Sequence, residues 1–413
     1  METIKVCLLT SEFLPNWGGV GTYCIELARA LACKVELHVV TLGREDRGKI
    51  IYSKNDIERF FDGKINVHLL RTCPANDTFL YNGIMQLAVY KNLPDLITTY
   101  NFDLVHTNIP QMADILLKIR KKTNIPSVTT IHTTIEGHRN GILRACSLSG
   151  LGFSKLDRSE KSVLLLFPLL KFAERLYIQK SKNFITVSNW MKEMLKKDFS
   201  SILNLHVIHN GVDLDKFSPA NSKDMQILDE VTGPIILLTS RLTALKGIHT
   251  FIQAIPKILK KKTNAHFIFA GGGSKEPWIE ELKKLNVNTS SYTFLGHLDY
   301  ELMPSLYSMA DILVLPSLYE NLPFGVLEAM SCKSAVVASR VGGITEVITD
   351  GINGVLFSPG NVEELAKIIT MLLEDGELRN RLGKNARQTI IKGFSWATIA
   401  ENTLRVYKEV LGM

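Results

Sequence analysis

The sequence predicts an α/β fold of two domains, each built on a parallel β-sheet with helices on both faces. The chain has 413 residues, about two to three times the usual length of one domain. Short apolar runs alternate with helical patterns along most of this length. Such alternation is typical of parallel sheets, whose strands are buried on both faces.

Each half of the chain contains its own series of apolar runs of strand length, separated mostly by helical patterns such as residues 21–32. The predicted strands of the first half are residues 4–10, 35–41, 67–71, 104–107, 127–132 and 184–188. Those of the second half are residues 234–239, 266–270, 292–295, 312–316 and 335–339. Because ligands of open α/β sheets lie outside the carboxyl ends of the strands, functional residues are expected directly after these runs, in a cleft between two facing domains.

The stretch H-N-G-V-D-L-D-K-F-S-P at residues 209–219 interrupts this alternation with turn residues, as a linker does. We therefore predict an N-terminal domain over residues 1–210 and a C-terminal domain over 211–393, with a last helix, 394–413, packing back on the first domain. Asp213 and Asp215 form a D-x-D pair, which holds a metal ion in some transferases. Acids in a turn more often serve turn geometry, so no metal site is predicted.

Composition narrows the class of protein. The amino terminus shows no signal-peptide pattern, and the longest apolar run, 163–170, contains Pro168 and is too short to span a membrane. The six cysteines include no C-x-x-C pair and are predicted to be reduced. A net charge of +7 is modest for this length, and no nucleic-acid partner is expected. We expect a cytoplasmic protein.

The positive charge is concentrated in one segment, residues 155–197, where ten Lys or Arg stand against four acids. One interpretation is a solvated helix surface, because Lys and Arg cover helices routinely. The other is a peripheral contact with an anionic membrane or an acidic acceptor. Both interpretations fit the segment.

Glycines and a histidine follow strands of the first half. Gly18, Gly19 and Gly21 open a helix in P-N-W-G-G-V-G, a turn that suits a phosphate or a purely structural role. Cys24 stands where a dinucleotide fingerprint needs a third glycine, so a nicotinamide cofactor is not expected. His132 ends the strand in T-T-I-H-T, where it is either a structural histidine or part of the cleft.

The second half carries more chemistry. Arg241 and Lys246, in S-R-L-T-A-L-K-G, follow its first strand and can clamp a diphosphate. Gly271 and Gly272 follow the second strand, in A-G-G-G-S, where a bulky side chain would obstruct a ligand.

The stretch Y-E-N-L-P-F-G-V-L-E-A-M at residues 319–330 follows the fourth strand. Glu320 lies in the loop, Pro323 can begin a helix, and Glu328 lies about one turn inside that helix. Both acids can reach one ligand at different points, although each alone is also an ordinary acid near a helix start. The amides of Phe324 and Gly325 belong to the first helical turn.

Taken in order, these motifs resemble those of the GT-B glycosyltransferases of family 4, which retain the anomeric configuration. The matches are P-N-W-G-G-V-G, I-H-T, H-N-G-V-D-L-D-K-F-S-P, S-R-L-T-A-L-K-G, A-G-G-G-S, F-L-G-H, E-x7-E and the V-V-A-S-R-V-G-G run, over nearly the whole chain. The resemblance implies a GT-B fold of two Rossmann-like domains and a nucleotide-sugar donor. The acceptor would be a hydroxyl of a lipid-linked molecule, a glycan or a small molecule.

The resemblance also implies a role for each site residue. Arg241 and Lys246 would stabilise the leaving diphosphate, Glu320 and Asn321 would face the donor sugar, and Glu328 would bind the ribose hydroxyls. Gly19, Gly271, Gly272, Phe324 and Gly325 would contact the donor through their backbone, and His132 would orient the sugar. No cofactor and no metal would be required. Asn321 and Leu322 depart from the family pattern, which leaves the sugar open.

Two other functions share this scaffold. A sugar-nucleotide epimerase would use the same cleft, and a non-catalytic carbohydrate-binding protein would keep the fold without the charged residues. The ordered motifs favour a transferase over the first, and the presence of Arg241, Lys246, Glu320 and Glu328 favours it over the second.

Overall fold

The computed structural model describes residues 3–14, 18–46, 49–74, 81–109, 114–120, 123–199, 204–219 and 231–413. The chain forms two compact units, each α/β. Unit 1 comprises Met1–Ile135, Pro168–Asn210 and Trp396–Met413, and unit 2 comprises Glu136–Phe167 and Gly211–Ser395. One segment therefore differs from the predicted ranges, because residues 136–167 group with the C-terminal unit.

Unit 1 contains a sheet in the order β3-β2-β1-β5-β6-β7-β8, with β4 also paired to β2. All pairings are parallel except that of β2 with β3. The strands are β1 Lys5–Leu9, β2 Glu36–Asp46, β3 Lys49–Ile50, β4 Asn66–Pro74, β5 Leu104–Ile109, β6 Ser127–Ile131, β7 Asn183–Thr186 and β8 Asn204–Val207. The six predicted strands of this half are all present; β3 and β8 are additional.

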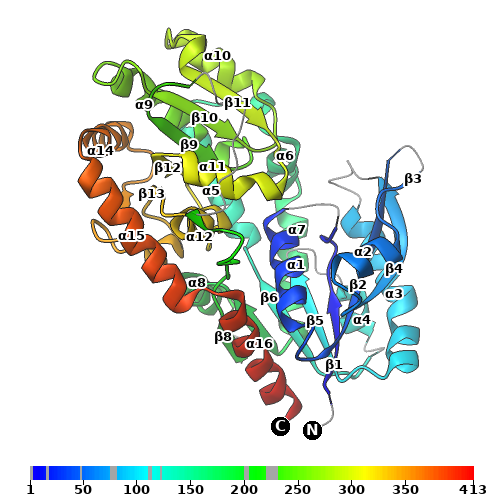
Figure 1. Cartoon of the computed structure of the whole chain (residues 1–413). Helices are drawn as coiled ribbons and strands as arrows, with labels where there is room; N and C mark the ends of the chain where they lie inside the picture. The colour runs from blue at the N-terminus through cyan, green and yellow to red at the C-terminus, as the bar shows by residue number, and fades with distance from the viewer. Residues whose placement is uncertain are drawn as a thin grey trace. The chain divides into compact units, whose positions relative to one another are not determined.

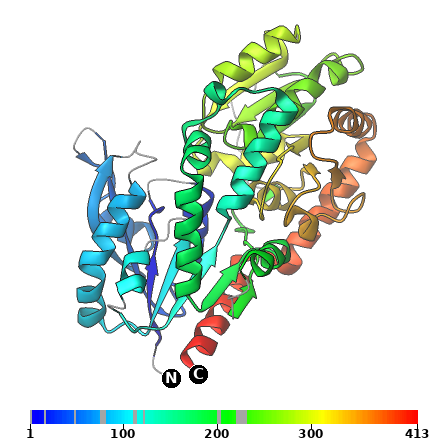
Figure 2. The same ribbon diagram turned by 180° about the vertical axis from the view of Figure 1, so that it is seen from behind.

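Helices cover both faces of this sheet. They are α1 Gly19–Leu31, α2 Lys54–Phe60, α3 Tyr81–Tyr100, α4 Ile115–Arg120, α7 Phe167–Lys180, α8 Asn189–Asp198 and α16 Trp396–Leu411. In Figure 1, α1, α2 and α16 lie on the near side of the strands, and Figure 2 shows α3, α4 and α7 on the other. The C-terminal helix α16 packs against α1 and β6, and the Tyr407 hydroxyl lies 2.6 Å from His106 Nδ1.

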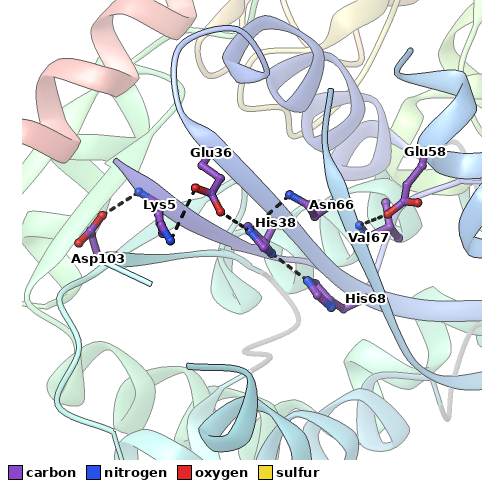
Figure 3. A network of polar contacts seen from close by, with 8 residues as sticks. All are labelled: Lys5, Glu36, His38, Glu58, Asn66, Val67, His68 and Asp103. Carbon is purple, nitrogen blue, oxygen red and sulfur yellow. Dashed lines mark hydrogen bonds and ion pairs between the residues drawn. The ribbon is translucent and has the colours of Figure 1, made fainter. Parts of the chain in front are cut away.

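A polar network joins the amino ends of β1, β2 and β4 in unit 1, at the edge opposite to the carboxyl ends of these strands (Figure 3). The backbone N–H of Lys5 donates to Asp103 Oδ2 at 2.7 Å, and His38 lies between His68, at 2.9 Å, and Glu36, at 3.1 Å. Burial and the neighbouring His38 lower the pKa of His68 to about 4. We interpret this network as a set of contacts that stabilises the pairing of β1, β2 and β4.

Unit 2 contains a parallel sheet in the order β11-β10-β9-β12-β13-β14. Numbered within the unit this order is 3-2-1-4-5-6, the order of dinucleotide-binding Rossmann folds. The strands are β9 Ile235–Thr239, β10 His266–Ala270, β11 Tyr292–Gly296, β12 Ile312–Leu315, β13 Ala335–Ser339 and β14 Val355–Phe357. The five predicted strands of this half are present, and β14 is additional.

The remaining helices belong to unit 2 apart from the first residue of α5. They are α5 Ile135–Ser149, η1 Phe153–Lys155, α6 Arg158–Leu165, η4 Ala244–Lys246, α9 Ile248–Leu259, α10 Glu276–Lys284, η5 Thr289–Ser291, η6 Tyr300–Leu302, α11 Met303–Met309, α12 Phe324–Ser331, α13 Ile344–Val347, α14 Val362–Glu374 and α15 Gly376–Gly393. The core is apolar and closely packed: α9 buries Phe251 completely against Phe267 and Phe269 of β10. Complete burial of one such side chain contributes about 1.5–3 kcal/mol.

The segment 211–219 is part of unit 2 rather than a loose linker. Phe217 is completely buried, and the Arg387 guanidinium donates to the carbonyls of Leu214, Phe217 and Ser331. Asp213 Oδ1 accepts from the N–H groups of Asp215 and Lys216 at 3.0 and 2.9 Å. This carboxylate therefore caps a turn. Within the described ranges no group of three or more His, Cys, Asp or Glu is placed to hold a metal ion.

Two further predictions concern cysteines and membranes. None of the six cysteines, all of which lie in described residues, forms a disulfide. Of the helices that the structure describes, none is both long and apolar enough to cross a bilayer.

Candidate active site

The predicted site residues of the second half lie around the point where the strand order of unit 2 reverses. The chain leaves β9 in one direction and β12 in the other, so the loops after these neighbouring strands lie at the position where open α/β sheets bind ligands. Arg241 and Lys246 follow β9, and Glu320 follows β12. The Leu318 N–H donates to the Leu245 carbonyl at 3.0 Å, which joins the two loops directly.

Gly247 explains how these loops fit together. It has φ +68°, and a Cβ atom there would lie 1.9 Å from the carbonyl oxygen of Pro316. The glycine ends the η4 turn and lets the backbone after Lys246 lie directly on the end of β12. Lys246 is thereby fixed at the edge of the sheet.

Lys246 and Glu320 form a partly buried ion pair. The ammonium donates to Glu320 Oε1, and Ser317 Oγ donates to the same oxygen at 2.9 Å. Only 20% of the Lys246 side chain and 11% of the Glu320 side chain are exposed. The two residues are thus brought together, and Glu320 is the ion-pair partner of Lys246.

Arg241 is arranged differently. Its side chain is exposed, and its guanidinium has no hydrogen bond or ion pair with any residue that the structure describes. A guanidinium presents a planar set of donors that matches phosphate oxygens. Arg241 and Lys246 therefore differ, since Lys246 is paired with a carboxylate and Arg241 has no such partner within the described ranges.

The glycines after β10 differ from one another. A Cβ atom at Gly271 would lie 1.9 Å from the carbonyl of Ser240, so this residue permits close packing of the loops after β9 and β10. Gly272 would meet nothing within 4 Å, which fits a surface open to a ligand. Gly325 lies near the end of β9, where its Cβ would be 3.1 Å from Thr239 Oγ1.

Glu328 lies in α12 and is held by two tyrosines. The Tyr300 hydroxyl donates to Oε1 at 2.7 Å, and the Tyr307 hydroxyl donates to Oε2 at 3.0 Å. Burial and the nearby Glu328 carboxylate raise the pKa of Tyr307 well above its usual value. Helix α12 begins at Phe324, which is half-buried, whereas Asn321 in the loop before it is buried.

Gly19 and His132 belong to unit 1. Gly19 begins α1, and a Cβ atom there would meet nothing within 4 Å. Glu12 Oε2 accepts from the Gly21 N–H at 3.3 Å, so a carboxylate lies at this helix start. Residues 15–17 of the predicted loop lie outside the described residues.

His132 follows β6 and contacts two polar neighbours. Its Nε2 lies 3.3 Å from Asn108 Oδ1, and its ring lies edge-on to Tyr23 with centroids 4.6 Å apart. Burial lowers the pKa of His132 to about 3, so the imidazole is neutral at physiological pH.

The sequence analysis missed helix α5, which packs on the loops of Lys246 and Glu320. A Cβ atom at Gly137 would lie 2.3 Å from the Tyr319 ring, and one at Gly141 would lie 2.2 Å from Leu245 Cδ1. The Leu245 N–H also donates to Glu160 of α6 at 3.0 Å. Glycines four residues apart on a helix are a signal for such close packing.

Helix α5 also brings His138 to the site. Its ring lies edge-on to Tyr319 with centroids 5.8 Å apart. Burial, with smaller contributions from Arg241 and Lys246, lowers the pKa of His138 to about 4. A neutral imidazole therefore stands beside the cationic side of the site.

The two sheets and their residues define a two-domain Rossmann-like α/β protein with charged side chains at the switch point of one domain. Comparison with known proteins identifies the family. Residues 17–216 match the family described as Glycosyltransferase Family 4, and residues 221–389 match Glycosyl transferases group 1. The chain is 30% identical to an alpha-maltose-1-phosphate synthase of Mycolicibacterium smegmatis, over 98% of this chain and 100% of the relative.

Solved structures share the fold. The sucrose-phosphate synthase of Thermosynechococcus elongatus superimposes with a TM-score of 0.76 at 21% identity, over 99% of both chains. HepE of Anabaena in complex with UDP-glucose gives 0.71 at 20% identity, over 98% of this chain and 100% of that one. The chain belongs to glycosyltransferase family 4, has the GT-B fold and is a hexosyl-type glycosyltransferase (EC 2.4).

Proposed function

We propose that this glycosyltransferase moves a sugar from a nucleotide-sugar donor to a hydroxyl acceptor with retention of the anomeric configuration. The observation that carries the proposal is the switch point of unit 2, where Arg241, Lys246 and Glu320 lie on joined loops. The complex of HepE with UDP-glucose supports a donor of this chemical class.

In the proposed mechanism the donor diphosphate binds the guanidinium of Arg241. Lys246 exchanges its contact with Glu320 for a phosphate oxygen, which releases the Glu320 carboxylate to the hydroxyls of the donor sugar. Both cations then stabilise the negative charge that develops on the leaving diphosphate. No divalent metal is needed in this scheme.

The reaction breaks the bond between the anomeric carbon and the phosphate oxygen and forms one to the acceptor oxygen on the same face. The acceptor proton passes to the departing phosphate oxygen, so no enzyme nucleophile is required. In this proposal Glu320 is a sugar-binding residue.

The test is transfer from a panel of UDP-, GDP- and ADP-sugars to glycan, lipid-linked and small-molecule acceptors, with the product anomer determined by NMR. Removing one preorganised charge in such a site costs about 10²–10³ in rate. We expect losses of that order in Lys246→Ala and Glu320→Gln. Lys257→Ala is the matched control, because Lys257 forms an exposed ion pair with Glu363 away from these loops.

Four outcomes would oppose the proposal. Absence of transfer and hydrolysis with every donor would refute the activity, and unchanged rates in Glu320→Gln would refute its role. Conversion of a sugar nucleotide without acceptor would instead identify an epimerase, and an inverted product would refute retention.

We also propose that the protein is cytoplasmic and meets its acceptor at an anionic membrane through α7. Leu169 and Phe172 on this helix are 63% and 65% exposed, and the exposed Arg175 lies one turn further along. Lys171 of the basic segment is engaged instead, with Glu174 at 3.2 Å. An exposed apolar pair followed by a cation suits a lipid surface, where each Lys or Arg near anionic headgroups contributes about 1 kcal/mol.

Co-sedimentation with vesicles of phosphatidylglycerol and phosphatidylcholine tests this contact. We expect Leu169→Ser/Phe172→Ser to abolish binding, and Arg175→Gln to weaken it about fivefold at low salt. Met371→Ser, on the exposed side of α14, is the control for surface hydrophobicity. Equal binding of all variants would contradict a role for α7.

A further inference from the structure

The side chain of Glu328 is held by residues that no sequence motif singled out. Tyr300, in the η6 turn after β11, donates to one carboxylate oxygen, and Tyr307, in α11, donates to the other. Tyr307 is almost completely buried and also lies 3.3 Å from Thr239 Oγ1. A carboxylate bound at both oxygens cannot rotate freely about its terminal bond.

The ring of Tyr300 is itself held by contacts with Lys216 and Phe217. The Lys216 ammonium lies over its ring, 4.2 Å from the centroid, and the Phe217 ring meets it edge-on at 5.4 Å. Lys216 also forms an ion pair with Glu301 at 2.6 Å. Lys216 and Phe217 belong to the segment that follows the division between the units, and Arg387 anchors that segment to the end of α12.

These contacts form a continuous series from the segment 211–217 through Tyr300 to Glu328. We propose that Tyr300, braced by Lys216, is a positioning residue that orients Glu328 for the vicinal hydroxyls of the donor ribose. The inference rests on the proposed function, since it assumes a ribonucleotide donor. It adds that the preference for ribose over deoxyribose is set partly by Tyr300 rather than by Glu328 alone.

The physical reason is the cost of orientation. A hydrogen bond to a charged group contributes more to binding when the group is already aligned, because a mobile side chain must be ordered on binding. The Tyr300 hydroxyl holds the Glu328 carboxylate in one orientation. Removal of this hydroxyl should therefore lower the affinity for ribonucleotides, whose ribose hydroxyls would contact Glu328. The affinity for 2′,3′-dideoxynucleotides should be nearly unaffected.

The experiment measures the affinity of the full chain for UDP, GDP and ADP by calorimetry, and then for the 2′,3′-dideoxy analogue of the tightest binder. For Tyr300→Phe we expect a five- to twentyfold loss of ribonucleotide affinity and less than a twofold change for the analogue. Tyr292→Phe is the matched control, since Tyr292 lies in β11 and contacts Phe294 rather than Glu328. It should match the wild type with both ligands.

A second pair of variants isolates the role of Lys216. Lys216→Met removes both the cation over the ring and the ion pair, whereas Glu301→Gln removes only the ion pair. We expect Lys216→Met to lower ribonucleotide affinity two- to fivefold and Glu301→Gln to leave it unchanged. Equal effects of the two would overturn the part assigned to the cation over the ring.

The remaining outcomes separate this inference from the proposed function. Absence of binding of any nucleoside diphosphate to the wild type would refute the proposed function, and the inference with it. Equal losses for ribonucleotide and dideoxynucleotide in Tyr300→Phe, or no loss, would overturn the inference alone. Thermal unfolding of each variant, compared with the wild type, distinguishes loss of alignment from loss of folding.

Discussion

Replacement of Gly247 by alanine tests how the two loops of the active site are joined. Two costs combine at this position. Its φ of +68° is a left-handed conformation that costs a residue with a side chain about 1–2 kcal/mol. A Cβ atom 1.9 Å from the Pro316 carbonyl oxygen forces a displacement of backbone, and overpacking of this kind costs about 1–3 kcal/mol.

The sum is a destabilisation of about 2–5 kcal/mol, which corresponds to a fall in Tm on the order of 5–15 °C for a unit of this size. Two control variants separate the contributions. Gly351 has φ +73° but open space around the position of a Cβ atom, so Gly351→Ala should be destabilised only by the conformational cost, about 1 kcal/mol. Gly272→Ala has neither feature and should lose almost nothing.

Differential scanning calorimetry of the three variants measures these differences. Asparagine tolerates the left-handed region, so Gly247→Asn should remain nearly as unstable as Gly247→Ala if the contact with Pro316 dominates. If Gly247→Ala and Gly351→Ala had the same Tm, the loop of Gly247 would be able to move away from Pro316 without a further loss of stability. The close joining of the Lys246 and Glu320 loops would then not be a rigid feature of the site.

Three further predictions follow from other contacts. In urea unfolding, Gly141→Ala should destabilise the protein by about 1–3 kcal/mol, because its Cβ would lie 2.2 Å from Leu245 Cδ1. The control Gly83→Ala lies in α3 with open space around its Cβ, so it should be neutral or stabilising by up to about 1 kcal/mol. His106 is completely buried, and burial lowers its pKa to about 3. The stability that its neutral form provides is therefore complete above the unfolded-state pKa of 6.5 and is lost as the pH falls towards 3. Between pH 6.5 and pH 3, the Tm of His106→Gln should fall less steeply than that of the wild type. Arg387→Met leaves the carbonyls of Leu214, Phe217 and Ser331 without this donor and should lower the free energy of unfolding by about 3 kcal/mol or more. The control Arg381→Met, on the same helix, should lower it by less than about 0.5 kcal/mol. Equal midpoints of the two variants in denaturant unfolding would contradict the anchoring role of Arg387.

Much of the fold follows from the sequence because its strands are long apolar runs. All eleven predicted strands are present, since near-continuous apolar stretches such as I-I-L-L-T in β9 have no alternative but burial. The strands β3 and β14 were missed because each has only two or three residues, and β8 because its sequence, N-L-H-V, carries little apolar character. Their pairing depends on neighbours that local patterns do not reveal.

Within the site, sequence alone placed residues after strands but not their partners. The closeness of Lys246 and Glu320 depends on β9 and β12 being neighbours, which is a property of the sheet order rather than of either motif. The roles of Tyr300 and Tyr307 were hidden for the same reason, since they lie 28 and 21 residues before Glu328.

The path of the chain between the two units has a consequence for protein engineering. The backbone passes from one unit to the other after residues 135, 167, 210 and 395, so neither unit is a single continuous stretch. A chimera that exchanged only residues 211–395 with a relative would keep Gly137 and Gly141 from one parent and take the residues facing them from the other. Exchange of donor specificity between such enzymes should therefore succeed more often when residues 136–167 are transplanted together with the C-terminal part.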